Sequence, residues 1–140
     1  MYDKYLVTGA TGFLGRAVVE ALAHRGARVH ALTLHNDPYI NLLPKEVHTI
    51  IGDVCVKNSL TDFFADADSR TCVIHCAGIV SVASRPGSKL YQVNVGGTWR
   101  VLRSRNSREY LLPHPAHLRS HIRRERQRAA FRKEKISPLR

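Results

Sequence analysis

Three glycines near the start of the chain, Gly9, Gly12 and Gly15, stand at a spacing that suits the binding of a diphosphate. A short apolar run ends just before them, and apolar residues at helical spacing follow: Leu14, Val18, Ala21 and Leu22. A strand, a glycine turn and a helix in this order hold a dinucleotide pyrophosphate, because the helix N-terminus offers free N–H donors and a positive dipole end. Residues 4–22 therefore predict a dinucleotide-binding unit.

Each glycine of this loop has its own expected task. Gly9 permits the tight turn, Gly12 lets the backbone approach the pyrophosphate, and Gly15 lets the helix pack closely on the sheet. The hydroxyls of Thr8 and Thr11 would add donors to the phosphates. The alternative is a purely structural glycine turn, which the strand before the loop and the helix after it disfavour.

The elements that must position this loop alternate along the first hundred residues. We expect strands at residues 5–7, 28–34, 47–51 and 72–76, and helices at residues 58–64, with Asn58 as N-cap, and 89–102. Such alternation is typical of an α/β protein with a parallel sheet and right-handed crossovers. The predicted fold is a partial Rossmann fold, with a parallel sheet of about four strands in the order 3-2-1-4. The composition of the fourth strand predicts burial on both faces.

The charge divides the chain into two parts. Residues 1–97 hold nine Lys and Arg against eight Asp and Glu, whereas residues 98–140 hold thirteen against three, so +10 of the net charge of +11 comes from residues 98–140. Pro113 and Pro115 interrupt the only apolar patch of the tail and exclude a central strand there. We expect residues 1–102 to form a nucleotide-binding half-domain and residues 103–140 a basic tail, disordered or partly helical.

Three cysteines, Cys55, Cys72 and Cys76, form no CxxC pair, and their odd number with no leader peptide predicts a reducing, cytoplasmic location. A metal site at Cys72, His75 and Cys76 is disfavoured because strand alternation turns His75 to the other face. No apolar run approaches the roughly 18 residues that cross a bilayer, so no membrane partner is expected.

Four short motifs occur in order along the chain: TGATGFLG at residues 8–15, GDV at 52–54, HCAG at 75–78 and VNVGGT at 93–98. Together they resemble the extended short-chain dehydrogenase/reductase family, also called NAD-dependent epimerase/dehydratases. Residues 75–84 look most like its branch of dihydroflavonol reductases and 3β-hydroxysteroid dehydrogenases. The resemblance covers residues 4–102.

The resemblance implies NAD or NADP as the cofactor, held at these positions: Gly9, Thr11, Gly12, Phe13, Leu14, Gly15, Asp53, Val54, Ala77 and Gly78. Asp53 would accept a hydrogen bond from the adenine amino group, and the Val54 N–H would bind a ring nitrogen. The backbone of Ala77 and Gly78 would pass near a ribose, and Asn94 would hold the helix and strand geometry. Asp53 as a simple turn residue is the alternative.

The choice between NAD and NADP stays open in the sequence. An acid that binds the ribose 2′-OH should stand at the end of the second strand. Thr33 and Leu34 occupy this place, so neither a carboxylate nor an arginine is present, although His35 is close.

The catalytic residues that the resemblance implies are a tyrosine and a lysine four residues later. None of the five tyrosines has a lysine at that distance, and Ser120, near the expected place of a catalytic serine, follows no valid strand. We therefore expect no catalytic residue, and whether the chain is an enzyme stays open. We expect a truncated or frame-disrupted relative, with the break near residues 99–105, that lacks a substrate domain.

Two other functions remain as alternatives. One is a dinucleotide sensor without turnover. The other is a non-specific nucleic-acid-binding module, since the runs RRERQR and RKEK of the tail would hold phosphates by counterion release. Only Phe131 is near for base stacking, and a charge run is more often a solvated tail, so nucleic acid is the less favoured partner. Substrate and oligomeric state stay open. Without a fifth strand, the apolar fourth strand would become an unprotected sheet edge, which predicts marginal stability.

Overall fold

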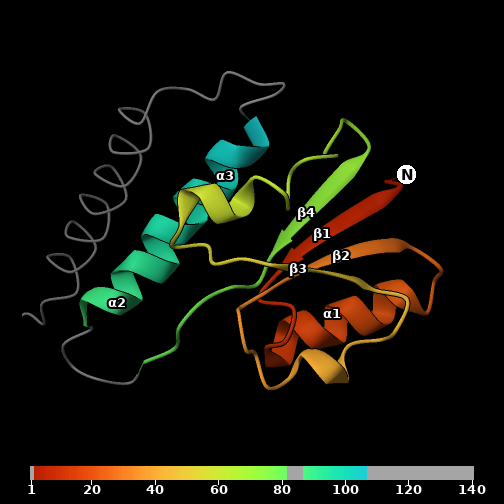
Figure 1. Ribbon diagram of the computed structural model, residues 1–140, viewed down its shortest axis with the longest axis horizontal. Coiled ribbons are helices and arrows are strands. Elements are labelled where there is room, and N and C mark those ends of the chain that lie inside the picture. The colour runs from red at the N-terminus through yellow and green to blue at the C-terminus, as the bar shows by residue number, and fades with distance from the viewer. Residues whose placement is uncertain (1, 82–86, 107–140) are drawn as a thin grey trace, which may run out of the picture. The chain divides into compact units, whose positions relative to one another are not determined.

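The computed structural model describes residues 2–81 and 87–106 of the chain (Figure 1). The chain divides into two compact units, Met1–Glu109 and Tyr110–Arg140, and all described residues belong to the first. The expectation of a disordered or helical tail thus falls largely on residues 107–140, which lie outside the described residues.

The centre of the unit is a sheet of four parallel strands. These are β1 (Lys4–Thr8), β2 (Arg28–Thr33), β3 (His48–Ile51) and β4 (Thr71–His75), in the order β3-β2-β1-β4. The predicted order is confirmed. Thr8 pairs with Leu32 on one side and with His75 on the other, so the carboxyl ends of β1, β2 and β4 lie side by side.

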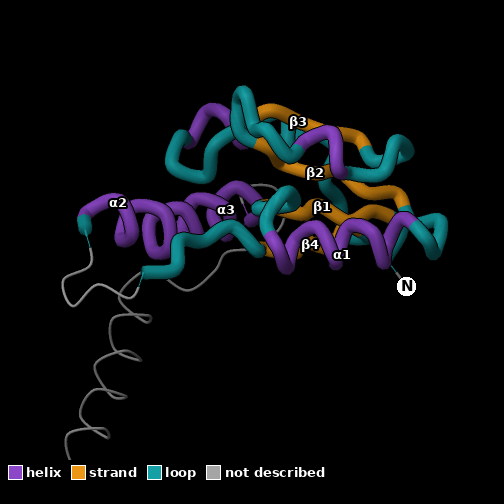
Figure 2. The backbone as a smooth tube through the Cα atoms, turned by 90° about the horizontal axis from the view of Figure 1, so that it is seen from below, coloured by secondary structure: helices purple, strands orange, loops and turns teal. Residues whose placement is uncertain are grey.

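Helices cover both faces of this sheet. Helix α1 (Phe13–Ala23) lies on one face, and a continuous helical run lies on the other, made of α2 (Ser88–Tyr91), the π-helical η3 (Gln92–Gly97) and α3 (Thr98–Asn106) (Figures 1 and 2). Two short 3-10 turns, η1 (Ile40–Leu42) and η2 (Lys57–Leu60), complete the unit. Within residues 2–81 and 87–106, no helix has the length and apolar character to cross a membrane.

Strand alternation divides the core into two apolar clusters. Val7 and Ala31 face α1, whereas their neighbours Leu6 and Leu32 face the cluster that contains Phe63 and Val101. A strand covered on both faces needs apolar side chains in both directions, which explains the near-continuous apolar runs of β1 and β2.

The helix that the apolar spacing predicts is confirmed as α1, but only part of that apolar set lies on its buried face. Its buried residues are Gly15, Val19 and Ala23, and Leu22 packs partly buried against the same cluster, whereas Leu14 is 64% exposed and Ala21 is also exposed. The physical reason is that α1 lies close to the sheet. The row of smaller residues at i, i+4 spacing fits this contact better than the bulkier row beside it.

The predicted helix over residues 58–64 is wrong. The structure has the 3-10 turn η2, whose N-cap is Val56, so Asn58 lies inside the turn. Ser59 explains this, because its hydroxyl lies within hydrogen-bond distance of two carbonyl oxygens of the preceding turn, those of Val56 at 2.8 Å and Asp53 at 2.7 Å, and donates its single proton to one of them, so it competes with helix formation. The adjacent rings of Phe63 and Phe64 then both enter the core.

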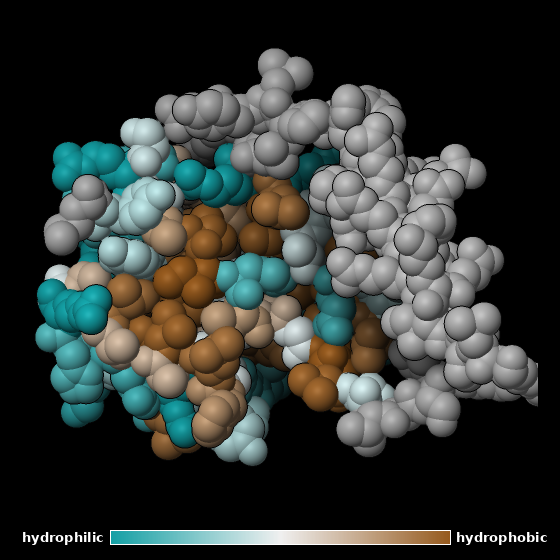
Figure 3. Space-filling view, turned by 180° about the vertical axis from the view of Figure 1, so that it is seen from behind, coloured by the Kyte–Doolittle hydropathy of each residue, from teal (hydrophilic) through white to brown (hydrophobic). Residues whose placement is uncertain are grey.

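The prediction that β4 is buried on both faces is also wrong. β4 is an outer strand of the described sheet, and its residues after Thr71 are only partly buried. Figure 3 views the molecule from behind Figure 1, where β4 is the nearest strand, and shows apolar side chains gathered on this face.

Candidate dinucleotide site

The glycine loop leaves the carboxyl end of β1 and leads into α1. Gly9 has a φ of +64°, which side-chain-bearing residues rarely adopt. A Cβ atom at Gly9 would also lie 2.6 Å from the backbone nitrogen of Ala77. Both constraints require glycine here, and the contact brings Ala77, another predicted site residue, against the loop.

Gly15 packs the first turn of α1 onto the same loop. A Cβ atom at Gly15 would lie 2.0 Å from the carbonyl oxygen of Gly9, closer than any real contact. Gly9 and Gly15 are therefore required by the packing of the chain itself, whatever the loop binds.

Gly12 is different, because nothing in the described chain requires a glycine there. It is the N-cap of α1, with φ −70° and ψ 168°, an ordinary extended conformation. A Cβ atom on Gly12 would have a single close neighbour, the Gly9 carbonyl oxygen at 3.3 Å. Gly12 therefore leaves open space directly over the helix N-terminus.

The amides of this N-terminus meet no side chain of the described residues. No side chain caps α1, and no acidic residue stands in its first turn. The first N–H groups of a helix lack intrahelical partners and carry a partial positive charge. Phe13 is 94% exposed and Leu14 64%, so the backbone of this turn lies at the surface. The arrangement suits an anionic group that accepts hydrogen bonds.

Thr8 does not contribute to this anion site, contrary to expectation. Its side chain is fully buried, and its Oγ1 lies 2.6 Å from Nδ1 of His75. Because Thr8 pairs with His75 across the β1–β4 ladder, its hydroxyl is held inside the sheet rather than at the loop.

His75 continues the polar contacts toward the helical run. Its Nε2 lies 3.0 Å from Oγ1 of Thr98, and this hydroxyl donates to the carbonyl oxygen of Asn94 at 2.7 Å. The Thr98 proton is thereby used, so Nε2 carries the histidine proton and Nδ1 accepts from Thr8. Burial lowers the pKa of His75, which agrees with a neutral ring.

Asn94 fixes the segment that follows β4. Its Oδ1 accepts from the backbone N–H of Ile79 at 2.7 Å, and its Nδ2 donates to the Ile79 carbonyl oxygen at 2.8 Å. Gly78, a predicted site residue, is exposed beside this clamp. The two hydrogen bonds hold the Ala77–Gly78 backbone at the carboxyl end of the sheet.

Asp53 and Val54 follow β3 at the same end of the sheet, with β2 between them and the glycine loop. Asp53 is half-buried, and its Oδ1 accepts from the Cys55 N–H at 2.7 Å, which leaves further acceptor sites on the carboxylate. Val54 is buried, and its side chain lies beside Gly97, where a Cβ atom would be too close to it. Burial, and then the Asp53 charge, raise the pKa of the Cys55 thiol.

Thr33 stands at the end of β2, the place where this fold often carries a ribose-binding acid. Its side chain is 2% exposed, and its Oγ1 has no hydrogen-bond partner among the described residues. The Thr33 side chain is therefore buried and does not reach the surface where a ribose would lie.

A carboxylate that the sequence analysis missed lies at the glycine loop instead. The hydroxyl of Thr11 donates to Oδ2 of Asp37 at 2.6 Å, although 26 residues separate the two in the chain. Asp37 comes four residues after the end of β2, and the turn at Asn36, with φ +59°, returns the chain toward the loop. The available signal was the Asn-Asp-Pro sequence, which is typical of a turn that re-aims a short acidic side chain.

Comparison with known proteins agrees with the geometry of this loop. The model of the NAD dependent epimerase/dehydratase family matches residues 5–111. Human 3 beta-hydroxysteroid dehydrogenase type 7 is 39% identical over 105 residues, covering 70% of this chain and 28% of that protein. A putative dihydroflavonol 4-reductase of Synechocystis is 31% identical over 104 residues, covering 73% of this chain and 29% of that protein. The chain thus spans less than a third of the length of either relative.

Solved structures resemble the described unit as well. A short-chain dehydrogenase/reductase superfamily protein from Agrobacterium tumefaciens, solved with bound NAD, has a TM-score of 0.58 and 28% identity, covering 74% of this chain and 29% of that one. A UDP-glucose 4-epimerase, with a TM-score of 0.62 and 23% identity over 73% of this chain and 31% of that one, shares the fold. The resemblance carried by the four sequence motifs is confirmed, and the chain belongs to the NAD-dependent epimerase/dehydratase family.

Proposed function

We propose that this chain is the dinucleotide-binding part of an oxidoreductase-like protein, and that it holds the diphosphate of NAD or NADP at the N-terminus of α1. The observation that carries the proposal is the open position at Gly12. A helix N-cap gains stability from Ser, Thr, Asp or Asn, whose side chains bond the first free amides. Gly12 has no side chain to make this bond, so both the amides and the space above them are open to a ligand.

The other expected residues would contact the remaining parts of the nucleotide from the same end of the sheet. Asp53 and the Val54 N–H would bind adenine, because a carboxylate accepts from the amino group while an amide donates to a ring nitrogen. The backbones of Phe13 and Leu14 would bind phosphate oxygens. Ala77 and Gly78 would pass beside the second ribose, where the Asn94 clamp positions them.

A bound nicotinamide dinucleotide supplies hydride transfer, and this chain's described residues would bind and orient it. No tyrosine of the sequence has a lysine four residues later, so we assign no catalytic residue. The structure neighbours and family support a dinucleotide as the ligand more directly than a nucleic acid, whose predicted contacts fall mainly on residues outside the described part of the chain.

The test is a matched pair of N-cap variants, Gly12→Asp and Gly87→Asp. Gly87 caps α2 with nearly the same backbone angles as Gly12, φ −67° and ψ 160°, and a Cβ there meets nothing within 4 Å. An aspartate at either cap favours the helix, but at position 12 its charge and volume occupy the diphosphate position. Calorimetric titration of the full chain with NADH and NADPH should show saturable binding that Gly12→Asp weakens at least tenfold and Gly87→Asp leaves unchanged. Equal binding by the wild type and Gly12→Asp would contradict the proposal.

A further inference from the structure

We infer that a small tetrahedral oxyanion, such as sulfate or inorganic phosphate, binds in a pocket near the amino ends of β1, β2 and β3, where Lys4, His30 and His48 meet. The inference goes beyond the proposed function, because the glycine loop leaves the opposite, carboxyl end of the parallel sheet. An ammonium group and imidazole rings supply the charge and the N–H donors that such an anion requires.

The pocket has a volume of about 70 Å³ and lies on the face of the sheet opposite α1. Side chains two positions apart on a strand point to the same face, so Lys4 stands beside Leu6, and His48 stands beside Ile50. The apolar part of the lining consists of Leu6, Ile50, Phe63 and Ala67. Because one water molecule takes about 30 Å³ of liquid, the pocket admits a small polyatomic ion and is too small for a nucleotide.

The Lys4 ammonium lacks a counterion in the described part of the chain. Lys4 is 9% exposed, and its Nζ donates a hydrogen bond to the carbonyl oxygen of Asp66 at 2.9 Å. No carboxylate oxygen of residues 2–81 and 87–106 lies within 4.0 Å of this nitrogen. An ammonium has three N–H donors, and a buried lysine is ordinarily paired with an anion. The remaining donors and the charge of Lys4 are therefore open to a ligand in the pocket.

His30 and His48 add two imidazole rings to the same pocket. They pair directly across the β2–β3 ladder, and their ring centroids lie 4.9 Å apart, edge to face. Among the described residues, neither ring has a hydrogen-bond or ion-pair partner. Imidazoles also bind metal ions, but no three His, Cys, Asp or Glu side chains of the described chain are placed to hold one. The Lys4 charge likewise favours an anion over a metal ion.

Two carboxylates make the charge of the pocket depend on pH. Asp62 and Asp66, exposed residues of the segment after η2, belong to the lining. With both imidazole rings neutral, these two negative charges outweigh the single positive charge of Lys4. Protonation of both rings reverses the sign of the sum. The anion should therefore bind more tightly as pH falls.

The surroundings of His30 agree with this coupling. Burial lowers its pKa, followed by the charges of His48 and Lys4, whereas Asp66 raises it and Arg28 lowers it again. An anion beside the ring would stabilise the imidazolium and raise this pKa. Because such coupling is reciprocal, a proton on the ring strengthens the binding of the anion to the same extent.

The experiment titrates the full chain with sulfate, which, unlike phosphate, keeps its charge over the pH range in which histidine titrates. The titration is done at about pH 6 and about pH 8, with chloride holding the ionic strength constant, and NMR of the histidine rings reports binding. The signals of His30 and His48 should shift saturably, whereas His24, the exposed C-cap residue of α1, should not respond. The dissociation constant should be at least about fivefold smaller at the lower pH.

A pair of variants with equal loss of charge tests the role of Lys4. Lys4→Met removes the charge and keeps the apolar stem, and should weaken sulfate binding at least about tenfold. Arg25→Gln is the control, because Arg25 is exposed just after α1, and it should leave binding unchanged. If Lys4→Met does not fold, His48→Gln decides, since His48 is an exposed residue outside the core. This variant should bind sulfate more weakly and with less dependence on pH.

The absence of a saturable shift at both pH values overturns the inference, and so does wild-type affinity in folded Lys4→Met or in His48→Gln. An equal loss in Arg25→Gln and Lys4→Met also overturns it, because binding would then follow the overall positive charge of the chain. NADH binding by Lys4→Met should stay at the wild-type level, so the result for this pocket is independent of the result for the dinucleotide site.

Discussion

The Oγ1 atom of Thr8 lies 2.6 Å from Nδ1 of His75, and this contact joins the carboxyl ends of β1 and β4 inside the sheet. Through Nε2, the same ring reaches Thr98 on the opposite helical run. His75 therefore links the strand that leads into the glycine loop with the helix that clamps Ile79. This link requires the neutral ring, because Nδ1 must accept a hydrogen bond from Thr8 while Nε2 donates one to Thr98.

The first prediction concerns pH. Burial lowers the folded-state pKa of His75, whereas the unfolded chain has a pKa of about 6.5. The unfolded state then binds more protons at acid pH, so stability is full above about pH 6.5 and is lost as pH falls toward the lower folded pKa. Urea unfolding of the full chain between about pH 7.5 and pH 5 should show this decline.

The variant His75→Gln separates this residue from other sources of acid sensitivity. Glutamine offers an acceptor and a donor for Thr8 and Thr98 but does not titrate, so the decline should become shallower. Some decline should persist, because burial, and then the charges of His48 and Lys4, also lower the pKa of His30. An identical slope in the wild type and His75→Gln would show that His75 does not couple protonation to folding.

A second prediction compares two helical glycines. Alanine at Gly15 would place its Cβ 2.0 Å from a backbone oxygen, whereas alanine at Gly96 would meet the far end of the Arg100 side chain at 2.9 Å. The backbone at Gly9 cannot move without losing its own contact with Ala77, but an arginine side chain rotates. Gly15→Ala should therefore lower the free energy of unfolding by about 3 kcal/mol, and Gly96→Ala by less than about 1 kcal/mol. Thermal unfolding measures both, and equal losses would contradict the packing role of Gly15.

The sequence predicted the parts of this site that depend on local spacing. The glycine turn and the helical run after β4 follow from glycines at fixed intervals and from apolar periodicity, the strand order follows from the fold class that these elements indicate, and all three are confirmed. The spacing predicted α1 but did not identify its buried face, because apolar residues lie on more than one side of this helix, and the close contact of Gly15 with Gly9 decides which side packs.

The roles of Thr8 and Asp37 depend on contacts between distant segments, which explains why the sequence did not reveal them. Thr8 looked like a loop hydroxyl, but its partner His75 is 67 residues away. Asp37 meets Thr11 across 26 intervening positions, after the turn at Asn36 that follows β2. Local sequence patterns predict the strands and helices, but they do not predict which side chains of distant segments come into contact in the folded chain.

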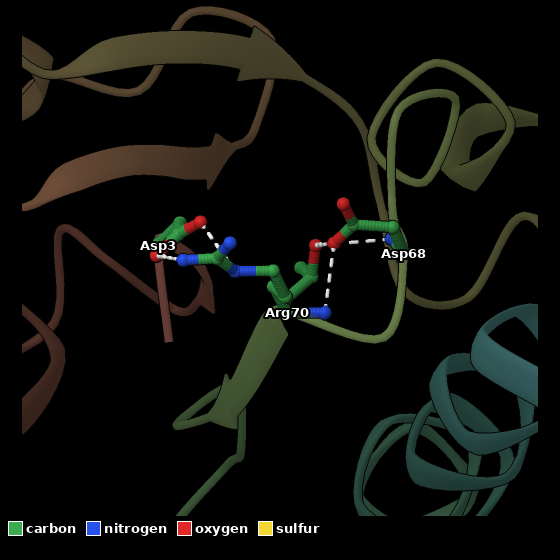
Figure 4. Close-up of polar contacts among 4 residues, drawn as sticks. Asp3, Asp68 and Arg70 are labelled. Carbon is green, nitrogen blue, oxygen red and sulfur yellow. Dashed lines mark hydrogen bonds and ion pairs between the residues drawn. The ribbon is translucent and has the colours of Figure 1, made fainter. Parts of the chain in front are cut away.

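The start of β4 offers a last prediction, because a buried and an exposed polar contact lie next to each other there (Figure 4). Arg70 binds Asp3 with both oxygens engaged, at 2.6 Å each, but both side chains are more than half exposed. Thr71 is fully buried; its hydroxyl donates to Asp68 Oδ1 at 2.7 Å and accepts from the Asp68 N–H at 3.0 Å.

Removing the Thr71 hydroxyl, which is fully buried, should cost more than removing the exposed ion pair. Thr71→Val keeps the shape but removes both hydrogen bonds between this hydroxyl and the exposed Asp68, so we expect the larger loss of stability in this variant. Asp3→Asn should cost less than about 1 kcal/mol, since exposed pairs gain little over hydration. Urea unfolding measures both losses. The Thr71 hydroxyl is also the main cause that lowers the pKa of Asp68, so titration by NMR should find that carboxyl pKa higher in Thr71→Val and unchanged in Asp3→Asn. A larger loss of stability in Asp3→Asn would mean that the ion pair, rather than the buried hydroxyl, fastens the start of β4.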